Sequence, residues 1–586
     1  MALFTPSESP AVVVKEIDLT GGVPNVQSTT GAIVGNFRWG QVEERVLVDN
    51  EATLVDTFAT PDSANTVDFH SAQYFLRYSS ALQVVREVTS AAANSRATLG
   101  QKRADSDETL NAELVKNGPD FEAQRSALDS DSHTFIGKYP GTLGNSLQVQ
   151  ICPSDSASSI FSNWTYVNNF DKTPSTSTFA ANQGATGDEV HIVVIDKEGK
   201  FTGTRGEILE TFQFLSVGKN AKNPDGTNNY AVDVVNERSR FVWMVEFDSD
   251  HLQAGASTDI DNGDNFTMTN RAIRTFNFNG GVNSTALGTS EFLTGFDLFE
   301  DKDQVEVDFL IAPGMTSTID QTTVVNDLVA TAQQTRKDCV VVSSPARDDI
   351  VNLTSAASIN TNVIATANTF TNSSYLVMDG NYLKTYDKYN DQFISIPAAS
   401  STAGIMAATD TNRAAWFSPA GSRRGQYLGI TALAYSPNKS QRDALYRADI
   451  NPIANIPGQG TILFGDKTML GRPSAFDRIN VRRLFLILER AIGRAAQQVM
   501  FEFNDEFTRA EFVNIIEPVL REVKGRRGIT DFRVVCDETN NTAAVVDRNE
   551  FIANIFIKPA RSINYVTLNF VAVRTGVDFE EVVGTV

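Results

Sequence analysis

The chain has 586 residues, of which 41% are hydrophobic and 21% are charged. These ordinary globular values exclude wholesale disorder and a collagen-like repeat, and the length predicts roughly three or four domains. The 71 acidic residues outnumber the 50 basic ones and give a formal net charge of −21. Because nucleic-acid-binding proteins usually carry a basic footprint, we expect no DNA or RNA contact.

The three cysteines, Cys152, Cys339 and Cys536, are far apart and form no paired motif. This spacing argues against a disulfide scaffold or a zinc module and fits synthesis in a reducing cytoplasm. The first ten residues lack the basic and apolar regions of a signal peptide. The longest runs of large apolar residues, 241–245 and 484–488, are far shorter than the ~20 residues that a membrane-spanning helix needs. We therefore expect no membrane insertion.

Residues 1–22 are predicted to form an extended N-terminal arm. Pro6 and Pro10 disfavour a helix, whereas the valines at 12–14 favour a strand, and two glycines end the segment. Such an arm cannot bury itself, so it must pair with another element to become ordered.

The central part of the chain is predicted to contain three regions. Residues 23–88 and 191–310 have strand-rich patterns and are assigned to one β-rich middle domain. Residues 89–190 are rich in Ala, Ser, Asp and Asn and poor in large apolar residues, which indicates a surface-projecting insertion. Residues 311–450 have the mixed helix and strand pattern of an α/β domain.

Residues 451–575 are predicted to form a compact α+β domain. Apolar residues recur at three- and four-residue steps from Val481 to Val499, with Asn480 as the expected N-cap. A second helix is expected to open with a capping box at 508–511 and to end near Gly525. Strand-like segments follow at 532–536, 551–557 and 563–573, and residues 576–586 form an extended C-terminal arm. The predicted fold class is therefore a mixed α/β, multidomain protein with two extended arms.

No catalytic motif is complete. The segment from Gly460 to Thr468 approximates a phosphate-binding loop, but Asp466 stands where the lysine should follow the second glycine. A strand followed by a turn explains this segment better, and a nucleotide-binding multidomain enzyme remains the remote alternative. The four histidines are scattered without metal-ligand spacing. We expect no enzyme activity, cofactor or metal.

Short motifs at several places along the chain carry a family resemblance. They are Phe-Arg-Trp-Gly at 37–40, Tyr-Pro-Gly-Thr-Leu-Gly-Asn-Ser-Leu at 139–147, the blocks at 296–299 and 309–314, and a longer series from 375 to 470 that includes Trp416-Phe417-Ser418-Pro419-Ala420. Together, in this order, they resemble the sheath proteins of contractile phage tails. Phe464 and Lys467 stand where this family often has Trp and Arg, and Ala11 and Ala415 where it often has Gly.

The resemblance implies a structural protein of the virion tail, assembled in the host cytoplasm. Sheath subunits form stacked hexameric rings around an inner tail tube, and contraction of this helical assembly drives the tube through the host envelope for genome ejection. The implied partners are further copies of the chain, the inner tube protein, and the baseplate and tail terminator proteins. The sheath of a headless contractile particle, such as a bacteriocin or a secretion-like injector, is the alternative within the same class.

Two sets of residues are candidates for the assembly contacts. The first is expected to pair as strands between subunits and comprises Val12, Val13, Val14, Ile17, Phe551, Ile555, Ile557, Val566, Leu568, Phe570, Phe579 and Val582. The second is expected to face the tube, because residues 466–535 contain 13 basic and 10 acidic residues in an otherwise acidic chain. It comprises Arg483, Arg490 and Arg494, whose spacing places them on one helix face away from the apolar stripe, and the loop residues Arg526 and Arg527. Pairing of these arginines with Glu489, Glu522 or a neighbouring subunit is the alternative.

Overall fold

The computed structural model describes residues 29–97, 113–130, 134–155, 159–245, 259–266 and 272–563. The described residues divide into two compact units, and the division falls within helix α12 (Ile479–Gln498). The main unit comprises the described residues of 29–415 and 419–490. The C-terminal unit comprises 416–418 and 491–563.

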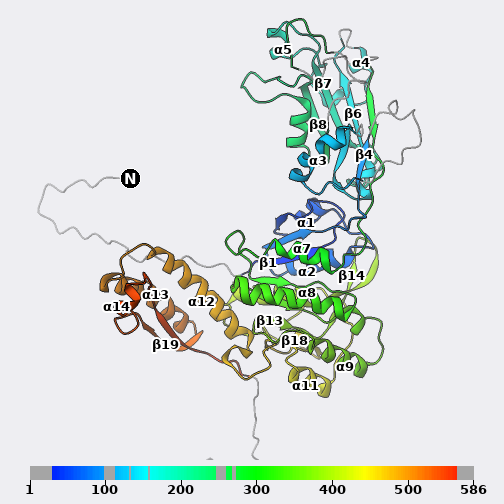
Figure 1. Cartoon of the computed structure of the whole chain (residues 1–586). Coiled ribbons are helices and arrows are strands. Elements are labelled where there is room, and N and C mark those ends of the chain that lie inside the picture. Colours follow the sequence, from blue (N-terminus) through cyan, green and yellow to red (C-terminus); the bar gives the residue numbers. More distant parts are fainter. Residues whose placement is uncertain are drawn as a thin grey trace, which may run out of the picture. The chain divides into compact units, whose positions relative to one another are not determined.

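A six-stranded sheet forms the centre of the main unit (Figure 1). Its strand order is β13-β12-β11-β1-β3-β2, and all neighbouring strands are parallel except β2 and β3. The strands are β1 (Gly31–Gly35), β2 (Arg45–Val48), β3 (Leu82–Arg86), β11 (Phe309–Ile311), β12 (Val340–Ser343) and β13 (Leu376–Met378). Their β-branched and aromatic residues fit a parallel sheet that is buried on both faces.

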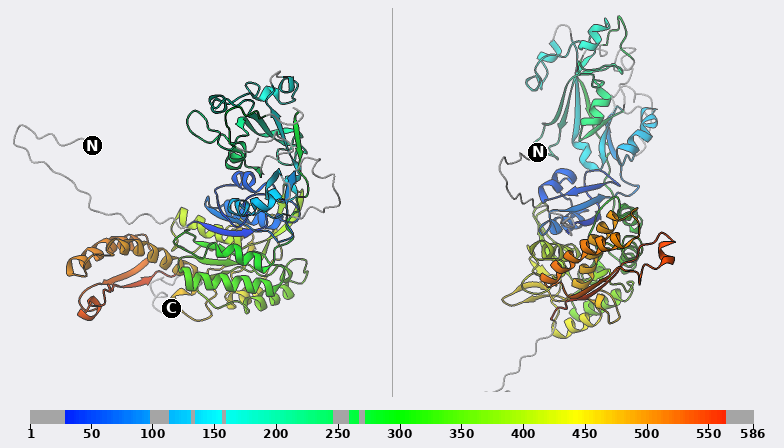
Figure 2. Two further views of the ribbon diagram at one scale, coloured as in Figure 1. Left: turned by 45° about the horizontal axis from the view of Figure 1, so that its top comes forward. Right: turned by 90° about the vertical axis from the view of Figure 1, so that its left-hand side faces the viewer.

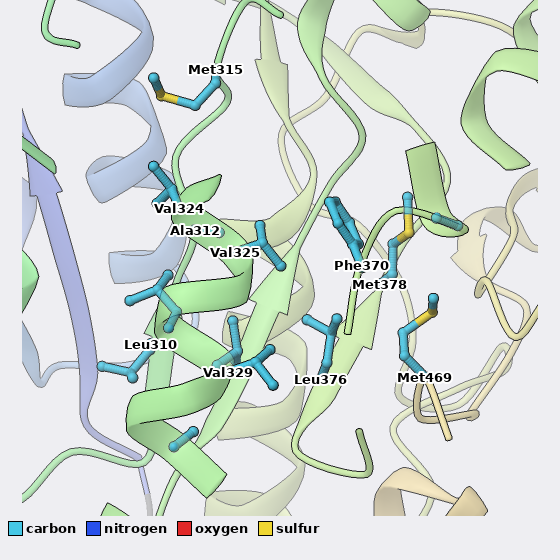
Figure 3. Packing of buried hydrophobic residues seen from close by; sticks show 14 of the residues in the cluster. Leu310, Ala312, Met315, Val324, Val325, Val329, Phe370, Leu376, Met378 and Met469 are labelled. Atoms are coloured by element: carbon cyan, nitrogen blue, oxygen red, sulfur yellow. The ribbon is translucent and has the colours of Figure 1, made fainter. Parts of the chain in front are cut away.

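Helices cover both faces of this sheet. Side chains alternate along each strand, so Leu310 and Val341 pack with α8 on one face, whereas Phe309 and Val340 pack with α2 and α10 on the other. Figure 3 shows Leu310 and Leu376 beside Val325 and Val329 of α8. The covering helices are α1 (Glu51–Phe58), α2 (Thr66–Leu76), α10 (Ala399–Asn412), α7 (Thr289–Asp297), α8 (Thr318–Ala330) and α9 (Ala356–Ala367).

The rest of this part of the main unit consists of short elements. They are the sheet of β14 (Tyr382–Asp387), β15 (Gln392–Pro397) and β16 (Ala432–Leu433), the hairpin of β17 (Ile453–Ile456) and β18 (Gly460–Leu463), and helix α11 (Lys439–Arg447).

A region between β3 and α7 has two sheets of its own (Figure 2). One contains β4 (Asn94–Ala97), β5 (Phe135–Pro140) and β9 (Val242–Met244), and the other contains β10 (Arg274–Asn277), β6 (Leu147–Pro153), β7 (Glu189–Asp196) and β8 (Glu207–Ser216). Its helices are α3 (Gly118–Ser130), α4 (Ser159–Ser162), α5 (Thr178–Asn182) and α6 (Ala231–Arg238). Both sheets contribute to one hydrophobic core, which includes Phe135 and Val149.

The strand pairing corrects the grouping of domains expected from the sequence. Strand β1 of 23–88 pairs with β3 and with Phe309 and Leu310 of β11, at the very end of 191–310, whereas the earlier strands β8, β9 and β10 of 191–310 belong to other sheets. Strand β6 of 89–190 pairs with β7, so the expected boundary at 190 falls inside a strand. The reason is that composition is a local property, whereas strand pairing joins segments that are far apart in the chain.

A buried arginine joins two of the sequence motifs. Arg86, at the end of β3, is 1% exposed and donates hydrogen bonds to the carbonyl oxygens of Phe37 (2.8 Å), Gly40 (2.7 Å) and Pro140 (2.7 Å). Gly141 follows with φ 137°, a conformation that favours glycine. The segments 37–40 and 139–147 therefore meet at this side chain, and each turns there through a glycine at positive φ, since Gly40 has φ 101°.

The C-terminal unit is built on a helix and a hairpin-like pair of strands. Helix α13 (Glu506–Gly525) buries Phe512, Ile516 and Leu520. Strands β19 (Ile529–Val535) and β20 (Asn554–Pro559) form a two-stranded antiparallel sheet, with α14 (Ala543–Val546) between them in the chain.

The two predicted helices are present, but their caps differ from the expected ones. Helix α12 already begins at Ile479, so Asn480 lies inside it. The cap of α13 is Asp505, whose carboxylate accepts a hydrogen bond from the Thr508 amide at 2.8 Å, and not Thr508. In the described part of the chain, no helix combines the length and apolar character needed to span a bilayer.

Candidate assembly surface

The β19–β20 sheet has two open edges in the described residues. Phe532 pairs with Ile557 and Val534 pairs with Ile555, and no third strand joins either side within the part of the chain that the structure describes. An edge strand presents main-chain donors and acceptors that a strand from another chain can pair with. The geometry therefore suits strand addition.

The residues expected to pair there occupy different places. Ile555 and Ile557 lie on β20, where they are half-buried and alternate with the exposed Phe556. Phe551 precedes the strand, and its ring packs edge-on against Phe512 of α13 with 5.2 Å between the centroids. Phe551 is half-buried, and this contact holds its ring against α13 within the same unit. The other expected pairing residues lie outside the described residues: Val12, Val13, Val14, Ile17, Val566, Leu568, Phe570, Phe579 and Val582.

Two of the five candidate tube-facing arginines are buried in ion pairs. The Arg483 guanidinium binds the Asp410 carboxylate of α10, and their side chains are 5% and 3% exposed. The Arg490 Nη1 atom lies 2.8 Å from Asp308 Oδ1, and its Nη2 donates to the Asp338 carbonyl oxygen at 2.9 Å. Burial raises the pKa of Asp308, while Arg490 and Arg483 oppose this increase.

The expectation that Arg483 and Arg490 point away from the buried stripe is therefore wrong. The helical spacing does place them on related faces of α12, but this helix is buried on more than one side, and both Val481 and Arg483 are under 5% exposed. Periodicity shows which residues share a face and does not show what covers that face.

Arg494, Arg526 and Arg527 belong to the C-terminal unit. Arg494 is half-buried, whereas Arg526 and Arg527 are exposed after α13. The Arg526 guanidinium lies 3.3 Å from Glu522 and 5.1 Å from the centre of the Trp416 ring. Pairing with Glu522 is the alternative that the sequence left open for Arg526.

Four large apolar side chains that sequence reasoning missed are exposed from the end of α12 to the first turn of α13. Met500, Phe501, Phe503 and Phe507 are 57%, 101%, 84% and 75% exposed. We call residues 500–507 the aromatic turn. The signal in the sequence was the presence of phenylalanines on both sides of the α13 cap, Asp505; the apolar residues that α13 buries begin only at Phe512.

The loop that approximates a phosphate-binding motif is engaged in internal ion pairs. Asp466 lies 3.0 Å from Arg478, and Lys467 lies 2.9 Å from Asp449. Lys467 also donates to the Tyr446 carbonyl oxygen at 2.7 Å. The segment leads into a three-residue 3-10 turn at Ala475–Asp477, not into the helix that a phosphate-binding loop precedes. Across the described ranges, no group of three or more His, Cys, Asp or Glu side chains could hold a metal ion.

Comparisons with known proteins identify the family of the chain. The family model for the phage tail sheath protein central domain matches residues 284–469, and that for the phage tail sheath C-terminal domain matches 472–572. The tail sheath protein of Enterobacteria phage T4 is 31% identical over 98% of this chain and 99% of its own length. The tail sheath protein of Vibrio phage KVP40 is 32% identical over the same shares of the two chains.

A solved structure has the same fold. The sheath tail protein from Listeria innocua is 12% identical, with a TM-score of 0.53 over 92% of this chain and 93% of its own. The fold thus defines a class of mixed α and β, multidomain proteins, and in this chain the C-terminal sheet has open edges within the described residues. The chain belongs to the phage tail sheath protein family.

Proposed function

We propose that this chain is the sheath subunit of a contractile phage tail. Its copies polymerise as stacked hexameric rings around the inner tail tube and contract to drive the tube through the host envelope. The observation that carries this proposal is the identity of 31–32% over nearly the whole length to two phage tail sheath proteins. The protein then acts in the virion tail, after assembly in the host cytoplasm.

Strand addition between subunits is the proposed lattice contact. The extended segments around Val12–Val14 and Phe579–Val582 of neighbouring copies add to the open edges of β19 and β20, with Val566, Leu568 and Phe570 in a further strand. Main-chain pairing holds copies together while the bodies attached to the arms rotate. A lattice connected in this way can shorten without losing its connections.

The proposed work of contraction needs no enzyme activity and no cofactor. The extended lattice stores the free energy, and the baseplate releases it. The ion pairs of Asp466 and Lys467 support this reading, because both side chains of the loop that approximates a phosphate-binding motif are used in the fold. The tail terminator protein and the baseplate bind the two ends of the sheath in this proposal.

The proposed tube contact is restricted to Arg494, Arg526 and Arg527, because Arg483 and Arg490 hold buried carboxylates. An exposed ion pair contributes only ~0–1 kcal/mol, and many repeated weak pairs can set the register and still separate during contraction. Reversal of Arg526 and Arg527 to Glu should abolish binding to purified tube, while sheath polymers without tube still form. Normal sheath–tube complexes from this variant would place the contact elsewhere.

The function is tested by negative-stain microscopy of purified protein with and without tube. The full chain should form rings or striated tubes, and a truncation of residues 1–20 should remain a folded monomer that does not polymerise. Circular dichroism of the truncated protein is the control for folding. Normal tubes from the truncated chain would disprove strand addition by the N-terminal arm, and monomers of the full chain under all conditions would disprove the sheath function.

A further inference from the structure

The aromatic turn has the chemistry of a docking element. Phe501, Phe503 and Phe507 are each at least 75% exposed, although burying a phenylalanine is strongly favourable. Contiguous exposed apolar residues of this kind mark interaction sites in soluble proteins. The turn therefore exposes a surface that a partner is needed to cover.

The backbone of the turn supports the same reading. Phe501 has φ 72°, in the left-handed region that bulky residues rarely adopt. Backbone strain of this kind is typical of functional segments. Here it occurs at Phe501, whose side chain is fully exposed and is not buried by any described part of the chain. The phenylalanines alternate with acidic residues, since Glu502, Asp505 and Glu506 are all exposed.

A surface with the opposite charge lies on the outer face of the β19–β20 sheet. Arg533 and Phe556 are cross-strand partners, and Lys558 follows two residues after Phe556 on the same face. All three are exposed, with Phe556 at 59%. We call Arg533, Phe556 and Lys558 the basic sheet face. Asp531, the cross-strand partner of Lys558, also lies on this face, where its carboxylate is 3.1 Å from the Lys524 ammonium group and 4.0 Å from that of Lys558. The face still keeps an excess of positive charge, because Arg533 and the two lysines surround this one carboxylate.

We propose that the aromatic turn of one copy docks on the basic sheet face of a second copy of this chain. The turn offers aromatic rings flanked by carboxylates, and the sheet face offers an aromatic ring flanked by a guanidinium and an ammonium group. Complementary charge favours this partner and fixes the orientation of the contact. Strand addition uses the edges of the same sheet, so the face remains open to the turn.

Two different surfaces of one chain meet in this contact, which is therefore head-to-tail. A head-to-tail contact that does not close on itself builds an open helical assembly. The inference rests on the proposed sheath function and adds to it a side-chain contact that gives direction to the polymer.

The test is a charge swap in the full-length protein. Glu502→Lys with Glu506→Lys reverses the turn, Arg533→Glu with Lys558→Glu reverses the sheet face, and a third variant carries all four changes. Each double variant should raise the protein concentration needed for sedimentable polymers by about tenfold or more, and the fourfold variant should recover most of this loss. Asp505 is left unchanged because it caps α13.

Matched controls separate this contact from general effects. Glu207→Lys with Glu237→Lys makes the same change of charge on exposed residues of the main unit and should leave polymerisation unchanged. Phe503→Ser should impair polymerisation, whereas Phe393→Ser, at a side chain that is 68% exposed on β15, should not. Thermal unfolding should differ by only a few degrees between variants, because each altered side chain is exposed and the charge lost from Glu506 in the first turn of α13 and from the Lys558–Asp531 pair contributes only weakly.

The outcomes distinguish the possible partners. Polymers of the reversed-turn variant at the wild-type concentration would disprove the contact while leaving the sheath function intact. Normal tube-free polymers with loss of tube binding would assign the turn to the tube protein and also disprove it. Failure of the fourfold variant to recover, with unchanged melting, would show that the two surfaces do not meet. A wild-type chain that never polymerises would disprove the sheath function itself and this contact with it.

Discussion

The central sheet and the β19–β20 sheet both carry large apolar side chains, but they differ in how far these side chains are buried. The central sheet has helices on both faces, and Leu310 and Val341 are fully buried. The β19–β20 sheet has two strands, and Phe556 on its outer face is 59% exposed. Within the described residues, α13 packs against β19 and covers only one face of this sheet, so its outer face and both its edges stay uncovered there. The main unit is completed by its own chain, whereas the C-terminal unit has surfaces suited to assembly.

The largest expected difference between the two units concerns their ion pairs. Asp410→Ala should lower the free energy of unfolding by about 3–5 kcal/mol, because it leaves the buried Arg483 without its carboxylate. Glu522→Ala removes an exposed partner of Arg526 and should cost only about 0–1 kcal/mol. Urea unfolding of the two variants measures this difference. Equal costs would contradict the assignment of the α12 arginines to the fold.

Truncation of apolar side chains should likewise reduce the free energy of unfolding more in the main unit than in the C-terminal unit. Leu376→Ala in β13 should destabilise the protein by about 2–5 kcal/mol, because the side chain is fully buried in the central core. Ile555→Ala in β20 should cost about 1 kcal/mol in the monomer, since that side chain is only half-buried. If the sheet is completed by a neighbour, Ile555→Ala should impair polymerisation more than folding. A larger loss of monomer stability at Ile555 than at Leu376 would contradict the comparison.

The sequence was sufficient for elements whose signal is local. Helices α12 and α13 followed from apolar spacing, and the ordered motifs identified the family. The central sheet did not follow from the sequence. Its strands β1 and β11 pair with each other although the whole region between β3 and α7 separates them in the chain. The partners of the arginines were hidden for the same reason, since Arg483 and Asp410 are 73 positions apart and Arg490 and Asp308 are 182 apart.

The pH dependence of stability should also differ between the units. In the main unit, burial raises the pKa of Asp379 to about 7, although the hydroxyls of Ser344 and Thr402 donate to its carboxylate. The folded state then holds a proton that the unfolded state releases above its ordinary pKa of 3.8, so this contribution to stability is lost as the pH rises towards 7. The slope is at most about 1.4 kcal/mol per pH unit.

Substitution of Asp379 isolates this effect. The Asp379→Asn variant should lose the corresponding slope between pH 5 and pH 7, as measured by chemical unfolding. In the C-terminal unit, hydrogen bonding and charge attraction from Lys524 lower the pKa of Asp531, so its contribution should instead be lost as the pH falls. Parallel pH profiles of wild type and Asp379→Asn would show that the buried carboxyl stays ionised.

The smallest expected effect on folding concerns Arg526. Its guanidinium pairs with Glu522 and lies over the Trp416 ring, and the indole Nε1 donates to the Arg526 carbonyl oxygen at 3.2 Å. Arg526→Ala should lower the free energy of unfolding by only about 0.5–1 kcal/mol, because the side chain is half exposed and the main-chain bond to Trp416 remains.

The same residue should matter more in assembly than in folding if the C-terminal unit presents its charges to partners. Arg526→Glu is expected to weaken cosedimentation with purified tube while the melting temperature changes by only a few degrees. Arg521→Glu is the matched control, since Arg521 is also exposed on α13 and pairs with Glu517 at 2.7 Å. Equal losses of tube binding in the two variants would indicate a general charge effect. A loss confined to Arg526 would show that this arginine contributes to tube binding. Arg483, in contrast, stabilises the fold of the main unit through its buried ion pair with Asp410.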